Sequence, residues 1–402
     1  MTAATNILHG KVDILRTPLY SLFLKLCESI WGAGNMIKAA CYIQIIVYYI
    51  SMYFFYRCLK YFVLNRVVLC AGTVVYGCAS IIIGFNTIAL TEPFAVSGVV
   101  FFAFCLLRYL NQEQEKERSM PWMICASFLA FLLTMLRPAG VYLFLAIAIL
   151  LATQWMFDKK RRQETLWAGL SCLVCVSLVF GYMLLNKLSN NFFGLSYVST
   201  MNQFYDVVQA GIYMDNSDTE VARDVQARID SGTGQLRAAF ETDEAFASFS
   251  PRNRIGDFNK EAIRNHFGEY CGYIWQKALD MGNNRMLYNY SHDGFKEGEP
   301  KVIMVGDYYA FNINFVYLLL VMEIGTVGYL IINKKKYPKE SILIILLIAG
   351  QIGLNLLAGP AEYHRLNAPV YPFAIILTAK CTDAIMQWQV PMSTVATETD
   401  RN

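Results

Sequence analysis

Charged residues are scarce in this sequence. Only 16% of its 402 residues are Asp, Glu, Lys or Arg, whereas 55% are hydrophobic and the mean hydropathy is +0.35. Because a soluble domain usually carries about 25% charged residues, the apolar excess is too large for a water-enclosed core and must face lipid. The net charge of +3 is also too small to indicate a nucleic-acid partner.

A disulfide framework and a metal motif are also lacking. Most of the 11 cysteines lie within apolar runs, and Cys271 is the sole cysteine of the one long polar segment, so that segment cannot close an internal disulfide. Cys172 and Cys175 lie three apart in a lipid-length run, where we interpret them as packing residues. We therefore expect no metal site and no cofactor.

Long apolar runs are what the sequence does contain. Unpaired backbone groups are not tolerated in hydrocarbon, so each run of about 20 apolar residues is interpreted as a membrane-spanning helix. The sequence predicts an all-α polytopic membrane protein with about nine transmembrane helices, at 36–57, 67–86, 92–110, 120–136, 138–157, 165–186, 308–333, 340–358 and 368–387.

Lysine and arginine are distributed unevenly between the loops, which predicts the orientation. The alternate short loops on one side carry only Arg137 and Arg365. The loops on the other side are rich in basic residues: Arg57, Lys60, Arg66, Arg108, Lys116, Arg118, Lys159, Lys160, Arg161, Arg162, Lys334, Lys335, Lys336 and Lys339. This pattern predicts an extracytoplasmic N-terminus and a cytoplasmic C-terminus.

The same orientation divides the chain into five parts. Residues 1–35 form the end of a first outer loop with an interfacial helix, 36–186 a bundle of six helices, 187–306 a mainly helical extracytoplasmic cap, 307–388 three further helices and 389–402 a cytoplasmic tail. Within the cap, 217–230 and 257–281 have helical spacing, with Ile263, Phe267, Tyr270 and Ile274 on one face. An odd helix count with an outer N-terminus leads us to expect that a first helix is missing, although unaided export of a short tail is the alternative.

Several polar residues lie at the predicted outer face. Asp13 and Arg16 precede Thr17 and Pro18, which are typical of a helix start, and the amphipathic run 19–30 is too short to span and should lie along the membrane surface. Glu92 opens the third helix, where an acid also suits the helix dipole. Arg137 lies at an outer turn, where it could equally extend to the lipid headgroups.

The densest outer cluster precedes the last helix and consists of Glu362, Tyr363, His364 and Arg365. Arginine binds phosphate oxygens with two nitrogen atoms at once. Carboxylates and arginines on one face are the groups that a lipid-phosphate enzyme requires, because the carboxylate accepts a proton and the arginines stabilise a phosphate leaving group. The sequence predicts that these residues share one face of the membrane.

These segments resemble those of the bacterial C-type glycosyltransferases, the relatives of the protein mannosyltransferases and aminoarabinose transferases. The similar segments are Gly10–Tyr20, Thr91-Glu92-Pro93, Leu136-Arg137-Pro138 and Tyr363–Pro372. The resemblance covers about residues 9–380 without the cap. It implies a polyprenyl-phosphate-linked sugar donor, an acceptor lipid, glycan or protein on the outer side of a bacterial cytoplasmic (inner) membrane, and transfer with inversion at the sugar carbon.

The resemblance assigns roles residue by residue. Asp13 and Glu92 are the candidate catalytic acids, and Arg16, Arg137, Tyr363, His364 and Arg365 are the candidate substrate-binding residues. The family's usual acid, upstream of the arginine-threonine-proline segment, would precede Met1, so Asp13 or Glu92 must replace it, or the chain is an incomplete or inactive form. Two alternatives remain open: a non-catalytic membrane protein that presents its outer domain to a partner, and a transporter or flippase, for which Glu323 is the main intramembrane candidate.

Overall fold

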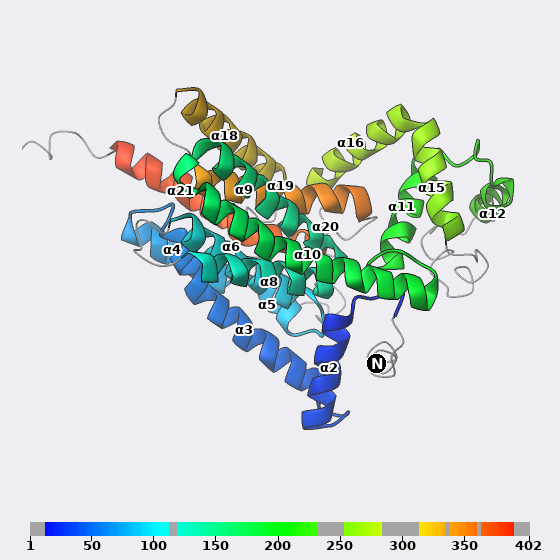
Figure 1. The fold of residues 1–402 in the computed structure, drawn as a ribbon, viewed down its shortest axis with the longest axis horizontal. Helices are drawn as coiled ribbons and strands as arrows, with labels where there is room; N and C mark the ends of the chain where they lie inside the picture. Colours follow the sequence, from blue (N-terminus) through cyan, green and yellow to red (C-terminus); the bar gives the residue numbers. More distant parts are fainter. Residues whose placement is uncertain are drawn as a thin grey trace, which may run out of the picture.

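The computed structural model describes residues 13–111, 119–230, 253–283, 313–333, 338–359 and 363–389. Every regular element in these ranges is a helix. The apolar helices run side by side as one bundle, and the helices of the predicted cap stand together at one end of it (Figure 1). The all-helical architecture agrees with the prediction from the sequence.

Six helical segments are long and apolar enough to cross a membrane: Met36–Leu59, Glu92–Leu110, Pro138–Phe157, Lys159–Asn190, Ile313–Ile332 and Lys339–Leu357. They contain the helices α3 (Met36–Leu59), α6 (Glu92–Leu110), η1 (Pro138–Val141) with α9 (Tyr142–Phe157), η2 (Lys159–Arg161) with α10 (Arg162–Asn190), α18 (Ile313–Ile332) and α19 (Lys339–Ala358). These segments define a multi-pass membrane protein. The count of nine spans stays a prediction, because three of the predicted spans, 67–86, 120–136 and 368–387, are not among the six. The structure is helical there in α4 (Arg66–Gly77) and α5 (Ser80–Asn86), in α8 (Met120–Leu136) and in α21 (Tyr371–Gln389).

Helix α6 is the centre of the bundle. Of the 18 residues of its apolar stretch, 89% are buried inside the bundle. The corresponding share is 17% for the segment that contains α10 and 22% for α18. The outer helices therefore turn large apolar side chains outward, for example Tyr49 and Tyr53 of α3 and Leu173 and Phe180 of α10. Because lipid accommodates these side chains, the amphipathic pattern of a soluble bundle is absent from these helices.

The predicted span 67–86 differs from the expectation of one continuous helix. The structure has α4 (Arg66–Gly77) and α5 (Ser80–Asn86), with a break between them. The hydroxyl of Tyr48 donates to the Tyr76 carbonyl, and the amide of Gln44 donates to the Ile88 carbonyl at 2.9 Å. Tyr48 of α3 thus contacts a carbonyl next to the break, and Gln44 contacts a carbonyl beyond the end of α5. Such contacts keep backbone groups paired where a helix inside a bundle is discontinuous.

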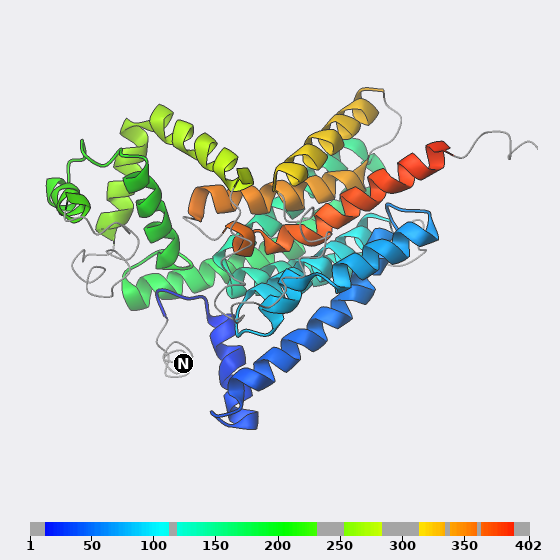
Figure 2. The same cartoon turned by 180° about the vertical axis from the view of Figure 1, so that it is seen from behind.

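Helix α2 (Pro18–Trp31) begins where the sequence predicts, with Thr17 at the N-cap and Pro18 as its first residue. It packs against the first half of α3 and lies at the same end of the bundle as the cap (Figure 2). Leu26, Ile30 and Trp31 are exposed on it. The expected position of this helix along the membrane surface stays a prediction.

The predicted cap contains α11 (Tyr197–Gln209), α12 (Thr219–Asp230), α15 (Asn253–Asn265) and α16 (Phe267–Asn283). Its helices enclose a separate small core that includes Phe204, Val225 and Phe258. The chain turns between α15 and α16, so Phe267 is 65% exposed and does not share the buried face that the sequence predicts for it with Ile263, Tyr270 and Ile274.

One buried ion pair joins two helices of the cap. Lys277 Nζ of α16 lies 2.7 and 2.8 Å from the two carboxylate oxygens of Asp206 of α11, and the side chains are 2% and 0% exposed. The Tyr273 hydroxyl also donates to Asp206, at 3.2 Å. Burial raises the pKa of Asp206 to about 6 and lowers the pKa of Lys277, while each charge acts against the shift of the other.

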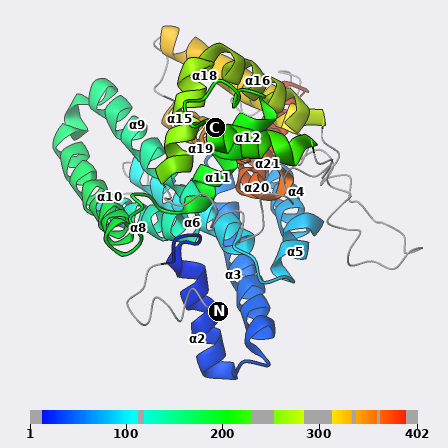
Figure 3. The ribbon, with the colours of Figure 1, turned by 90° about the vertical axis from the view of Figure 1, so that its right-hand side faces the viewer.

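Residues Ile14–Thr17 connect the cap to the bundle. The backbone N–H of Tyr197 donates to the Ile14 carbonyl at 2.8 Å, and the Ser196 hydroxyl donates to the Leu15 carbonyl at 2.5 Å. Thr17 uses its hydroxyl not as a helix cap but as a donor to the Leu136 carbonyl, at 3.0 Å. Seen from the cap end, α2, α11 and α20 (Tyr363–Leu366) surround the same end of the bundle (Figure 3).

Candidate functional site

Glu92 is a buried carboxylate at the cap end of the central helix. It is the first residue of α6 and is 1% exposed. Pro93 follows it, and proline in the first turn sacrifices no helical hydrogen bond, so this sequence favours a helix start here. A carboxylate at the N-terminus is favoured by the helix dipole. Burial nevertheless costs the charged form free energy unless the carboxylate has partners.

Two arginines from distant parts of the chain supply these partners. Arg365 Nε lies 2.9 Å from Glu92 Oε1, and Arg137 Nη1 lies 3.6 Å from the same oxygen. The side chains of Arg365 and Arg137 are 27% and 14% exposed, whereas that of Glu92 is 2% exposed. The three groups together carry one net positive charge, and the positive groups are the accessible ones.

Polar contacts fix the backbone next to each arginine. Leu136 accepts the Thr17 hydroxyl, and the following residue, Arg137, is extended with φ −147° and ψ 130°. Next to Arg365, the Gln351 amide donates to the Leu366 carbonyl at 2.8 Å, and Asn355 donates to the Asn367 side chain at 2.6 Å. Both guanidinium groups therefore start from constrained backbone, which reduces the entropy lost when they hold a ligand.

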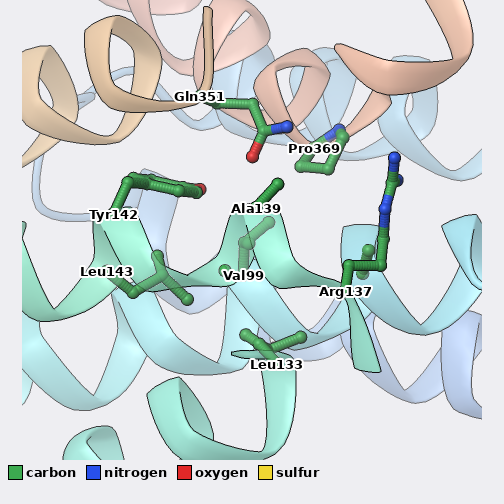
Figure 4. A pocket seen from close by; sticks show the side chains of 10 residues that line it. Val99, Leu133, Arg137, Ala139, Tyr142, Leu143, Gln351 and Pro369 are labelled. Atoms are coloured by element: carbon green, nitrogen blue, oxygen red, sulfur yellow. The ribbon is translucent and has the colours of Figure 1, made fainter. Parts of the chain in front are cut away.

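A small pocket opens beside Arg137. It lies where α6, α8, η1, α9, α19 and η4 (Ala368–Val370) meet, and its volume of about 20 Å³ is enough for about one water-sized group. Figure 4 shows Arg137 at its edge and the polar ends of Tyr142 and Gln351 directed toward it. The remaining lining is apolar: Ala95, Val99, Leu133, Ala139, Gly140, Leu143 and Pro369.

Asp13 and Arg16 lie at the junction of the cap and the bundle. One carboxylate oxygen of Asp13 accepts the backbone N–H groups of Leu15 at 2.7 Å and Arg16 at 3.1 Å, which is a local turn. Arg16 is exposed. Among the described contacts, neither residue joins the Glu92 cluster, so the structure brings together Glu92, Arg137 and Arg365 but leaves Asp13 in a structural turn.

Two predicted substrate-binding residues are placed only in part. Tyr363 and His364 lie in the short helix α20 next to Arg365, and their side chains fall outside the described residues, as does Glu362. The backbone of α20 leads directly into Asn367 and η4, which are buried. The position of Arg365 in the site is therefore the part of this motif that the structure describes.

Sequence reasoning missed the buried amides and Tyr142. Gln351 and Asn355 are 3% and 4% exposed in the otherwise apolar helix α19. Polar residues inside a membrane helix are costly and mark either a structural hydrogen bond or a functional site. Their spacing of four residues places both on one face of the helix. This spacing was the signal that could have directed attention to α19.

Lys380 is another residue that the sequence prediction passed over. Its ammonium group lies 2.5 Å from Glu323 Oε1 and 3.1 Å from the Ser341 hydroxyl, so that α18, α19 and α21 are joined by one polar cluster. Glu323 was the main intramembrane candidate for the transporter alternative. It has Lys380 as a cation partner, and Lys380 also contacts Ser341, so the cluster connects three helices.

No family model, no curated protein and no solved structure matches the chain. The fold defines the class, a multi-pass helical membrane protein, from its own six long apolar helices. Any more specific role has to be argued from the cluster of Glu92, Arg137 and Arg365.

Proposed function

We propose that this protein is a membrane glycosyltransferase that transfers a sugar from a polyprenyl-phosphate donor to an acceptor hydroxyl or amine on the extracytoplasmic face, with inversion. The observation that carries the proposal is the meeting of Glu92, Arg137 and Arg365 at one end of the bundle. These residues come from three segments that are far apart in the sequence and that resemble the same family.

The charge of the cluster favours an anionic ligand. Two guanidinium groups around one buried carboxylate leave an excess positive charge, and the arginines are reachable while the carboxylate is nearly enclosed. Arginine is well suited to phosphate because its nitrogens match two phosphate oxygens. A position at the end of a lipid-facing bundle suits a phosphate that carries a polyprenyl chain, since the chain can remain in the hydrocarbon.

The proposed reaction is one displacement. The acceptor oxygen or nitrogen forms a bond to the anomeric carbon of the sugar while the bond from that carbon to the phosphate oxygen breaks. The polyprenyl phosphate leaves with both bonding electrons, and Arg137 and Arg365 stabilise the added charge. Attack on the face opposite the leaving phosphate inverts the configuration of that carbon.

Glu92 is the group that we assign to the acceptor proton. Both arginines contact Oε1, whereas Oε2 faces the Thr91 hydroxyl at 3.3 Å. Oε2 is therefore the oxygen that would accept the proton, and it requires the acceptor within about 3 Å. Asp13, the other candidate acid, has one oxygen committed to two backbone N–H groups, so we rank it second.

A transfer assay on purified protein in lipid nanodiscs tests this function. Polyprenyl-phosphate sugars are supplied with the lipids, and the release of free polyprenyl phosphate is measured. Glu92→Gln should reduce turnover by about 10²–10⁴-fold, and Arg365→Gln or Arg137→Gln by about 10²–10³-fold. Arg162→Gln, a change at an exposed arginine, is the matched control and should leave turnover unchanged. Unchanged turnover in all three site variants would remove the mechanism.

The side of the membrane has its own test. Cys271 of α16 is exposed in the cap, so a membrane-impermeant thiol reagent added to intact cells should label it. The same treatment of Cys271→Ser gives the background from the other cysteines. Labelling of Cys271 only after the membrane is opened would place the cap in the cytosol and exclude an extracytoplasmic reaction.

A further inference from the structure

The hydroxyl of Tyr142 is buried without a hydrogen-bond partner among the described residues, although Tyr142 is only 4% exposed. Buried tyrosine hydroxyls normally find a partner. An unsatisfied buried donor costs about 1–3 kcal/mol. Because the Tyr142 hydroxyl lies at the wall of a pocket, it is suited to donate a hydrogen bond to a ligand group that enters the pocket.

The packing of Tyr142 holds this hydroxyl in place. Tyr142 is the first residue of α9, and its ring lies against Gly350 of α19. A Cβ atom on Gly350 would be 2.6 Å from the ring, so only glycine permits this close approach. The ring cannot move toward α19 without a clash with its backbone, and its polar end stays directed at the pocket (Figure 4).

Gln351 supplies the complementary group. Its amide nitrogen is already committed to the Leu366 carbonyl at 2.8 Å. The amide oxygen is directed into the pocket (Figure 4), where it can accept a hydrogen bond from a ligand. The pocket thus offers one donor and one acceptor at fixed positions above an apolar floor that includes Val99 and Leu133.

These features select the chemistry of the ligand. No carboxylate is among the lining residues, so the pocket does not match an ammonium group. A hydroxyl group both donates and accepts, as the pair of Tyr142 and Gln351 requires. The space of about 20 Å³ that is open to water-sized groups suits a hydroxyl or hydroxymethyl group.

We propose that Tyr142 and Gln351 bind one hydroxyl of the transferred sugar and so select which sugar is accepted. The inference rests on the proposed function, because Arg137 at the pocket edge would hold the phosphate to which that sugar is attached. A phosphate on Arg137 places its sugar next to the pocket. The ring remains outside, and a single substituent enters.

Equilibrium binding to the full chain in nanodiscs tests the inference without any need for turnover. The probes are undecaprenyl phosphate and undecaprenyl phosphate that carries glucose, mannose, galactose or arabinose. The wild type should bind at least one sugar-bearing lipid more tightly than the sugar-free lipid. Tyr142→Phe should reduce that preference about tenfold, as for the loss of one hydrogen bond, and should leave the affinity for sugar-free lipid unchanged.

Deoxy analogues of the preferred sugar identify the hydroxyl. The wild type should lose the same factor of about ten on one analogue alone. Tyr142→Phe should lose no more on that analogue, because the hydroxyl and the phenol are the two halves of one contact. Tyr182→Phe is the matched control: its hydroxyl is also buried without a partner among the described residues, but Tyr182 does not line the pocket.

The outcomes separate the inference from the function on which it rests. If wild type binds undecaprenyl phosphate, loses it in Arg365→Gln and shows no sugar preference, the pocket holds only water and the inference is wrong while the function stands. If Tyr142→Phe weakens all lipids equally, or none, the inference is also wrong. If the wild type binds none of these lipids, both proposals fall.

Discussion

The ion pairs of Glu92 should be measurable as coupling energies in a double-mutant cycle. The variants are Glu92→Gln, Arg365→Gln, Arg137→Gln and the two double variants that include Glu92→Gln. Glu92→Gln keeps the shape of the side chain and removes its charge, whereas each Arg→Gln change removes one charge and also shortens the side chain. The coupling is the difference between the effect of a double variant on the free energy of unfolding and the sum of its two single effects.

The two distances set the expected magnitudes. At an effective dielectric constant of about 20, charges separated by the observed 2.9 and 3.6 Å attract with about 6 and about 5 kcal/mol. The desolvation of the buried carboxylate cancels in such a cycle, but solvent that reaches the pair weakens the attraction. The two arginine side chains remain 27% and 14% exposed, which screens them further. We expect net couplings of about 2 kcal/mol for Arg365 and about 1 kcal/mol for Arg137.

The chain carries its own reporters for the assay. Cys27, Cys58 and Cys105 are buried, whereas Cys70, Cys78, Cys125 and Cys271 are exposed. A thiol-reactive dye therefore gives a baseline from the exposed thiols and a rise in fluorescence when the buried ones are released. Each kcal/mol should shift the midpoint by about 2–4 °C for domains of 150–250 residues, and by less for a longer chain.

An exposed ion pair provides the control. Asp257 pairs with Lys260 at 3.1 Å within α15, where the side chains are 71% and 78% exposed, and the same cycle there should give about 0–0.5 kcal/mol. A Glu92 coupling no larger than this value would refute the arrangement of the three groups. Additive effects at Arg365 combined with strong coupling at Arg137 would show that the arginines occupy exchanged positions.

Further consequences can be measured on the same protein. Thr17→Val should lower stability by about 1–2 kcal/mol, because the buried Leu136 carbonyl loses its donor, and Thr17→Ser should restore most of it in the same thermal assay. Gly140→Ala should lower stability by about 1–3 kcal/mol, since its Cβ would lie 2.7 Å from the backbone of the preceding helix; wild-type stability would contradict this packing. The pKa of Asp206 is raised from 3.8 to about 6 in the folded protein. Protonation of Asp206 therefore adds its full contribution to the free energy of unfolding below about pH 3.8, and this contribution is lost as the pH rises through about 6. The wild type should thus gain about 1 kcal/mol over Asp206→Asn on going from pH 7.5 to 5, and a constant difference between the two would contradict the raised pKa.

The helical segments and the Glu92 cluster were predictable for different reasons. Apolar length located the long helices of the bundle, because the bilayer fixes the length of a span. The break between α4 and α5 was not predictable, since the hydrogen bond next to it, from Tyr48 to the Tyr76 carbonyl, comes from another helix. Hydropathy reports how well the residues of one segment suit a lipid environment, and it contains no information on hydrogen bonds from another helix.

The grouping of Glu92, Arg137 and Arg365 followed from their shared end of the bundle, but their contacts could not be derived. A shared face places residues in one layer without stating which are neighbours. Asp13 illustrates the gap, because the same reasoning placed it with Glu92, whereas its carboxylate closes a local turn. Tyr142 could not be predicted from the sequence, because a tyrosine at a helix start commonly has a packing role. Its importance comes from a buried hydroxyl that has no partner among the described residues.

The hydrogen bonds of residues Ile14–Thr17 make a mechanical link between two bodies. This stretch is attached to the start of the cap at Ser196 and Tyr197, and three residues later to the carbonyl that precedes Arg137. Because this stretch is only four residues long, it can change its length very little. A tilt of the cap would therefore displace the guanidinium of Arg137 at the cap end of the bundle. We predict that an acceptor bound to the cap changes the affinity of Arg137 for the phosphate of the proposed donor. Spin labels on the cap and on α2 would then show correlated movement when an acceptor is added, and independent movement would exclude the link.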